Sequence, residues 1–210
     1  MKIIQASVKI MTPVNGVDVL RRIETCGRVC YKSEGKITDG SAEQFVRNLI
    51  QRGHESVLEH VSITVKFICD RGVSHEIVRH RLASYSQEST RYCNYSKDGF
   101  GGEITVIKPL YLEEGTRSFD CWRGACETAE SAYFSLLELG CSPQEARAVL
   151  PNSLKTEVVM TANLREWRHF FKLRTAPAAH PQMREVACMA LAELRSMIPV
   201  VFDDYNGPMV

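Results

Sequence analysis

RHRLASYSQESTR, residues 79–91, is the stretch around which this chain is organised. Its thirteen residues include three arginines, a histidine, three serines, a glutamine and a glutamate. So polar a run has no apolar face to bury, and a plausible helix precedes it at residues 74–78. We therefore expect a helix end that passes into an irregular loop facing a ligand. Guanidinium groups bind phosphates through paired hydrogen bonds, and serine hydroxyls can fill the remaining acceptors. From these residues alone, a solvated charged loop is the alternative interpretation.

The composition of the whole chain is that of a globular protein. A length of 210 residues suits one domain, residues 1–210, and the hydrophobic content of 44% and charged content of 24% are ordinary. A net charge of +1 argues against a dedicated nucleic-acid binder. No apolar run reaches membrane-spanning length, and the N-terminus lacks the apolar core of a signal peptide. We expect a cytoplasmic protein that binds neither nucleic acid nor membrane.

Cysteine and histidine spacing predicts neither disulfides nor a metal site. The eight cysteines include no Cys-x-x-Cys pair, and nothing indicates export, so we expect most of them to be reduced core residues. The segment HESVLEH, residues 54–60, is similar to a zinc-protease motif. That motif needs histidines four apart on one helix face, and here they are six apart.

Periodicity and capping signals outline the secondary structure. They predict strands at 2–11, 61–67, 104–107 and 154–162, and helices at 17–31, 41–53, 119–140, 143–150, 163–174 and from 181 onward. Capping boxes are expected at Ser41, Ser142 and Asn163, each with Glu or Gln three residues later. The glycine-rich segment 97–102 is typical of a flexible connection, and residues 203–210 are typical of a frayed tail.

The order of residues within the opening stretch resembles a family signature. Arg79-His80-Arg81, then seven residues, then Ser89, with Arg91 two further on, resembles the signature of the flavin-dependent thymidylate synthases. The resemblance continues in HES at 54–56, in EARAVLP at 145–151 and in NLREWRHFFKLR at 163–174. It implies an α+β fold, with a mixed sheet flanked by helices. It also implies a homotetramer whose sites lie between subunits.

The resemblance implies the conversion of dUMP to dTMP. In that family, 5,10-methylenetetrahydrofolate supplies the carbon, reduced FAD supplies the hydride, and NADPH reduces the flavin beforehand. Classical thymidylate synthases instead use a cysteine nucleophile that follows a proline. None of the eight cysteines here follows a proline, so we expect no cysteine nucleophile.

The resemblance also implies roles for particular residues. The expected cofactor-binding residues are His54, Ser56, Arg79, His80, Arg81, Gln87, Asn163, Arg165 and His169. The expected substrate-binding residues are Glu76, Arg79, Gln87, Glu88, Ser89, Arg91, Arg147 and Arg174. Arg174 is the expected catalytic residue, because a guanidinium near the pyrimidine can stabilise developing negative charge. Glu76 stands where glutamine is often found, and His169 where asparagine is frequent. For Ser89 we expect binding, because an activated serine needs an adjacent base and the sequence pairs it with none.

Two other function classes stay open at this point. One is a non-enzymatic module that binds a nucleotide or nucleic acid through the arginine cluster, for which salt-dependent retention on DNA is the signature. The other is a flavoprotein with different substrate chemistry, because a fold does not fix a function. Flavin absorbance of the purified protein would exclude the first class.

Overall fold

A computed structural model describes residues 1–97, 99 and 101–205. Its elements in chain order are β1 (Lys2–Ile4), β2 (Ser7–Ile10), α1 (Gly16–Val29), η1 (Glu34–Lys36), α2 (Ser41–Gln51), η2 (Glu55–His60), β3 (Ser62–Asp70), α3 (Arg71–Ile77), β4 (Ala83–Gln87), β5 (Thr105–Ile107), α4 (Arg117–Glu138), α5 (Pro143–Ala146), η4 (Arg147–Val149), β6 (Lys155–Asn163), α6 (Leu164–Arg174), α7 (Pro181–Met197) and α8 (Pro199–Phe202). The predicted flexible connection at 97–102 and the predicted frayed tail at 203–210 lie partly outside the described residues.

The described strands form two sheets. β1 and β5 pair in parallel, and the other sheet has the strand order β2-β3-β6-β4. Helices flank the sheets, so the α+β class expected from the sequence is confirmed. The single first strand predicted at 2–11 is wrong, because β1 and β2 belong to different sheets.

The prediction that the stretch 79–91 is irregular is also wrong in part. Residues Ala83–Gln87 form β4, at the end of the four-stranded order. Along this strand Ala83, Tyr85 and Gln87 are half-buried, while the serines between them are exposed. A strand needs only one covered face, and small or amphipathic side chains can supply it. The helix before the stretch starts earlier than predicted, at Arg71, with Asp70 as its N-cap.

Contact clustering divides the chain into two compact units. The first unit comprises Met1–Ser7, Phe67–Arg79 and Ser86–Val158. The second unit comprises Val8–Lys66, His80–Tyr85 and the residues from Val159 onward. The organisation of residues 1–210 as one domain stays a prediction.

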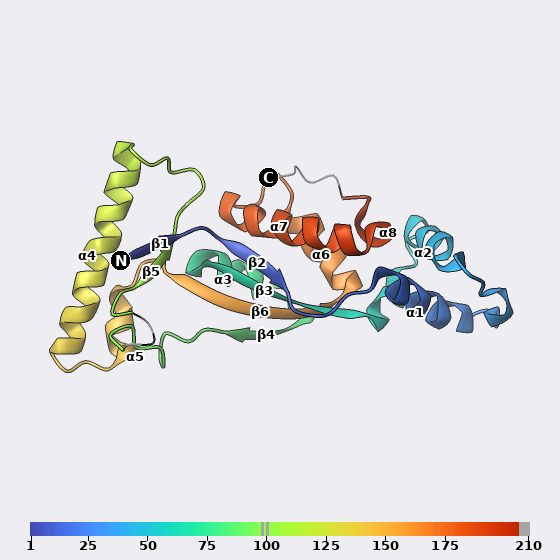
Figure 1. Ribbon diagram of the computed structural model, residues 1–210, viewed down its shortest axis with the longest axis horizontal. Helices are drawn as coiled ribbons and strands as arrows, with labels where there is room; N and C mark the ends of the chain where they lie inside the picture. The colour runs from blue at the N-terminus through green and yellow to red at the C-terminus, as the bar shows by residue number, and fades with distance from the viewer. Residues whose placement is uncertain (98, 100, 206–210) are drawn as a thin grey trace. The chain divides into compact units, whose positions relative to one another are not determined.

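The core of the first unit gathers around α4, which is the yellow-green helix in Figure 1. Cys126 and Tyr133 lie on the buried face of α4, as its amphipathic pattern predicts. Trp122 packs at the margin of this core and donates its indole N–H to Ser153 Oγ at 2.9 Å. The capping box predicted at Ser142 is confirmed and opens the short helix α5.

An aromatic cluster on α6 forms much of the core of the second unit. Trp167, Phe170 and Phe171 are completely buried, and the ring of Phe171 also meets that of Phe202 on α8. The indole N–H of Trp167 donates to the carbonyl of Ile63 on β3 at 3.1 Å. Figure 1 shows α6, α7 and α8 packed side by side. The cluster holds α6 in one position, which fixes the polar side chains at both of its ends.

In the second unit, one local prediction is wrong because a distant partner takes the expected group. The predicted capping box at Ser41 does not form, because helix α2 already includes Ser41 and its N-cap is Gly40. The Ser41 hydroxyl donates instead to the buried carboxylate of Glu24, at 2.7 Å. The helix predicted from 181 onward is α7, and a short further helix, α8, follows it.

Candidate active site

In the first unit, a turn after β4 brings hydroxyl and guanidinium groups together. Arg147 NH1 donates to Thr90 Oγ1 at 3.2 Å, although 57 residues separate the two. Ser89 Oγ accepts the backbone N–H of Arg91 at 3.3 Å. The side chains of Arg91 and Arg147 are exposed. The predicted residues Ser89, Arg91 and Arg147 therefore gather at one turn, where they can bind an anion.

Gln87 and Glu88 are held by partners within the first unit. Gln87 donates its amide to Ser74 Oγ at 3.0 Å and to Thr156 Oγ1 at 3.4 Å. Lys155 donates to Glu88 Oε2 at 2.9 Å and also to Glu157. These bonds fix both predicted side chains beside the turn at Ser89. Lys155 and its two carboxylates were not among the predicted site residues.

Glu76 and Arg79 lie just upstream, at the end of α3. Glu76 is half-buried, and its carbonyl accepts the backbone N–H of Arg79 at 3.3 Å. Arg79 lies in the turn that follows, and its side chain is exposed. Both belong to the first unit, as do Ser89, Arg91 and Arg147.

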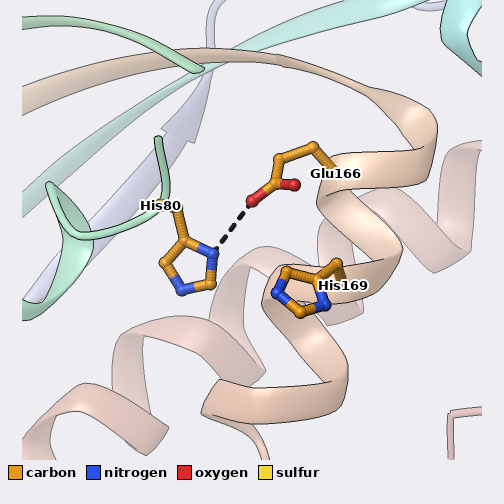
Figure 2. A group of neighbouring side chains, drawn as sticks. All are labelled: His80, Glu166 and His169. Atoms are coloured by element: carbon orange, nitrogen blue, oxygen red, sulfur yellow. Dashed lines mark hydrogen bonds and ion pairs between the residues drawn. The ribbon is translucent and has the colours of Figure 1, made fainter. Parts of the chain in front are cut away.

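In the second unit, His80 lies between the carboxylate of Glu166, drawn in Figure 2, and the guanidinium of Arg174. Its Nδ1 is 3.0 Å from Glu166 Oε1, and Arg174 Nε donates to its Nε2 at 3.0 Å. His169 lies nearby on α6, and its ring centroid is 5.7 Å from that of His80. Three predicted residues, His80, His169 and Arg174, are thereby brought together. Glu166 was predicted only as a capping partner of Asn163, and its carboxylate bonds His80 instead.

Burial affects the protonation of His80 and of its neighbour Tyr85. His80 is 5% exposed and Glu166 is 6% exposed. Desolvation lowers the pKa of His80, and the nearby charge of Arg174 lowers it as well, whereas the hydrogen bond to Glu166 opposes the change. Burial, together with the charge of Glu166, raises the pKa of Tyr85 to about 12. At neutral pH the imidazole is therefore uncharged and the Tyr85 phenol is protonated.

The remaining predicted residues lie around η2 and the first turn of α6, which pack together. His54 and Ser56 are exposed on either side of Glu55. The Asn163 side chain accepts the backbone N–H of Glu166 at 2.9 Å as the N-cap of α6. Arg165 donates to Glu59 Oε1 at 2.6 Å, in an exposed ion pair. Arg81 is exposed just before β4.

Sequence reasoning missed Thr90 and Glu166 for different reasons. Thr90 lies inside the quoted stretch, so its hydroxyl was visible beside Ser89 and Arg91. Nothing local indicated the contact of Glu166 with His80, because the two residues are 86 apart in sequence. The spacing from Asn163 pointed to a capping box, and the tertiary contact prevailed.

One group of potential metal ligands is present among the described residues. The ligand atoms of His80, Glu166 and His169 lie within 4.8 Å of one another. Both imidazole nitrogens of His80 are already hydrogen bonded, one of them to a guanidinium. A cation there would have to displace Arg174 and would be repelled by its charge. The geometry therefore fits a hydrogen-bonded chain better than a metal site.

Among the helices in the described part of the chain, none has the length and apolarity needed to cross a bilayer.

Known proteins are similar to this chain along most of its length. Residues 15–200 match the family described as thymidylate synthase complementing protein. The flavin-dependent thymidylate synthase of Geobacter sulfurreducens is 34% identical over 193 residues, covering 89% of this chain and 81% of that protein. The one from Pyrococcus furiosus is 32% identical over 183 residues, covering 87% and 74%.

The fold is also found in a solved structure. The UMP/dUMP methylase PolB from Streptomyces cacaoi, bound with 5-Br dUMP, superposes with a TM-score of 0.78 and 24% identity. The match covers 97% of this chain and 96% of that one. At this identity the likeness shows a shared fold. Taken with the family match and the sequence relatives, it places the chain in the flavin-dependent thymidylate synthase family.

Proposed function

We propose that this protein is an enzyme that methylates dUMP to dTMP, with 5,10-methylenetetrahydrofolate as carbon donor and NADPH-reduced FAD as hydride source. The observation that carries the proposal is the contact between Arg147 and Thr90. It joins two segments of the family signature into one anion-binding turn. The names of the relatives and the bound nucleotide analogue of the similar structure identify the class of anion.

The turn suits the phosphate of dUMP. A nucleotide monophosphate is dianionic near neutral pH, and two guanidinium groups with adjacent hydroxyls offer several charge-assisted donors. Arg91 and Arg147 supply the guanidinium groups and Ser89 supplies a hydroxyl. Glu76, Arg79, Gln87 and Glu88 complete the proposed substrate set. Ser89 binds in this scheme and does not attack, since its Oγ accepts a backbone N–H within a turn.

Arg174 is the proposed catalytic group. The methylation requires the pyrimidine ring to become nucleophilic, which places negative charge near its N3–C4 edge. A guanidinium held in advance by the protein stabilises such charge without reorganising in the transition state. Arg174 is half-buried at the end of α6 and is held by His80, so it meets this requirement.

The chemistry of the exposed donors suits a flavin dinucleotide. In the second unit His54, Ser56 and Arg81 are exposed and can donate to a diphosphate, and exposed Arg79 of the first unit belongs to the same proposed set. His80, Gln87, Asn163, Arg165 and His169 complete the proposed set. Asn163 already caps α6 and Arg165 pairs with Glu59, so these two would act chiefly by shaping the site. Bound FAD, once reduced by NADPH, would supply the hydride.

No cysteine acts as a nucleophile in this proposal. Burial raises the pKa of the thiols of Cys69, Cys93, Cys126 and Cys188, which keeps them protonated. None of the eight cysteines follows a proline, as the nucleophile of the classical enzymes does, so mass spectrometry of protein incubated with dUMP should show no covalent adduct on a cysteine.

We propose a cytoplasmic homotetramer, in keeping with the family resemblance, and light scattering in solution would test the assembly. The function itself is tested by titrating the purified protein with FAD and then assaying dTMP. Formation of dTMP should require dUMP, methylenetetrahydrofolate, NADPH and FAD, each omitted in turn. Failure to bind FAD, or dTMP formation that persists without it, would refute the proposed reaction.

A further inference from the structure

The hydrogen-bond directions around His80 form an ordered chain. A guanidinium group only donates, so Nε2 of His80 must accept the bond from Arg174 Nε at 3.0 Å. A neutral imidazole with an accepting Nε2 carries its proton on Nδ1. Nδ1 therefore donates to Glu166 Oε1 at 3.0 Å (Figure 2). The carboxylate selects the tautomer that Arg174 requires.

The ring of His80 is also held in place by its surroundings. Its edge meets Phe170, with ring centroids 4.9 Å apart and an interplanar angle of 60°. The Tyr85 hydroxyl donates to the backbone carbonyl of His80 at 2.6 Å. Glu166 and Arg174 lie on opposite sides of the ring on the same helix, α6, which the aromatic cluster fixes. A ring held in this way can transmit an orientation from one polar partner to the other.

We propose that Glu166 and His80 are positioning residues that hold the guanidinium of Arg174 in the orientation needed for dUMP. This inference rests on the proposed function, and it goes beyond it by assigning the two residues that prepare Arg174. His80 then acts through Arg174 in addition to its expected place in the flavin set. Glu166 has no expected contact with any ligand.

A double-mutant cycle tests this assignment. His80→Phe keeps a ring against Phe170 and removes the acceptor for Arg174. The dissociation constant for dUMP should rise about tenfold, as expected for one lost hydrogen bond to a charged group. Adding His80→Phe to Arg174→Ala should produce little further loss, because the guanidinium that His80 orients is gone. Calorimetry of FAD-saturated protein measures dUMP binding, which does not depend on any effect of His80→Phe on FAD affinity.

Glu166 provides a second pair of variants in case His80→Phe does not fold. Glu166→Gln keeps an oxygen that accepts from Nδ1, so dUMP binding and turnover should stay within about threefold of wild type. Glu166→Leu removes the acceptor that keeps the proton of His80 on Nδ1. It should raise the dissociation constant for dUMP about as much as His80→Phe does. Lys172→Ala, on the exposed side of the same helix, is the matched control. It should behave as wild type.

The outcomes separate this inference from the proposed function. If wild type forms dTMP but the losses from His80→Phe and Arg174→Ala multiply, the positioning role is refuted and the function stands. Equal losses in Glu166→Gln and Glu166→Leu also refute it, since a merely structural carboxylate would tolerate neither. A wild type that binds FAD and dUMP but forms no dTMP refutes the proposed function. The double-mutant cycle in dUMP binding would still measure the coupling between His80 and Arg174.

Discussion

Two arginines on the same helix, Arg168 and Arg174, are used in opposite ways. The side chain of Arg168 is 6% exposed and lies among carboxylates, with bonds to Glu55 and Asp204 and to the carbonyl of Val201. Arg174 lies at the C-terminal end of α6 and donates to a neutral imidazole nitrogen. The charge of Arg168 is balanced by acidic neighbours, whereas this partner of Arg174 fixes a direction without neutralising a charge.

The difference separates an arginine paired with carboxylates from the one that we propose as the catalytic group. A guanidinium paired with carboxylates ties elements together, and here it joins η2, α6 and the residues after α8. A guanidinium whose Nε donates to a neutral acceptor is oriented by that bond, and that bond does not neutralise its charge. The variants below test this distinction, in order of decreasing free-energy effect.

Arg168→Ala should give the largest effect, and the effect should fall on stability. Glu55 and Asp204 would lose their shared cation, and a buried side chain would leave a cavity. Breaking such a pair costs about 3 kcal/mol of unfolding free energy. Urea unfolding measures it, with Lys172→Ala as the control on the same helix. A loss below about 1 kcal/mol would show that this network is no more than a surface ion pair.

Arg174→Ala should leave unfolding free energy and FAD uptake near wild type and should slow dTMP formation about a hundredfold, equivalent to about 2.7 kcal/mol. Arg174→Lys should recover little, because an ammonium lacks the planar fork. NADPH oxidation in the absence of dUMP should survive in both variants. Near-normal dTMP formation by Arg174→Ala would reduce the residue to a favourable charge at a helix end.

Arg147→Ala extends the comparison to an arginine of the first unit that we propose as a phosphate ligand. It should raise the dissociation constant for dUMP about tenfold, because one charge-assisted contact to phosphate is lost. Gln144→Ala, on the exposed face of neighbouring α5, is the control. Deoxyuridine, which lacks the phosphate, should bind both variants equally. Unequal binding of deoxyuridine would show that Arg147 acts on the base or the fold and not on the phosphate.

Acid pH should give the smallest effect. Burial lowers the pKa of His80 below its ordinary value of 6.5, so the unfolded chain takes up the proton first. The stability due to neutral His80 is complete above pH 6.5 and is lost as the pH falls from there through the lowered pKa. Facing groups that modulate this are Glu166, Arg174 and His169 on α6 and Tyr85 on β4. The unfolding free energy of wild type, measured with urea, should therefore fall more between pH 7 and pH 5 than that of His80→Phe. Identical pH dependences of the unfolding free energy in the two proteins would contradict the assignment.

The sequence predicted best where periodicity alone decides the structure. β3 follows its alternation, with Ile63, Val65 and Phe67 buried, and α4 follows its apolar stripe. The capping box at Ser142 needs only residues three apart, and it forms. Such features depend on short-range geometry that the chain displays directly.

Prediction failed where a polar side chain had a choice of partners. Ser41 binds Glu24, 17 residues earlier, and Glu166 binds His80, 86 residues earlier. In each case the sequence offered a local hydrogen-bond partner. The side chain instead bonds a buried polar or ionic partner that is distant in the sequence. The candidate site shows the same pattern: the signature named the candidate residues His80 and Arg174, but the link between Glu166, His80 and Arg174 depends on tertiary structure.

The two tryptophans of this chain fall one to each unit, Trp122 in the first and Trp167 in the second. Trp167 is completely buried, so its fluorescence should be shifted to the blue, while Trp122 lies at the edge of its core. With either one replaced by phenylalanine, the remaining indole reports on a single unit. Coincident emission transitions in denaturant would mean that the units melt as one cooperative body, and separate transitions would reveal which unit loosens first.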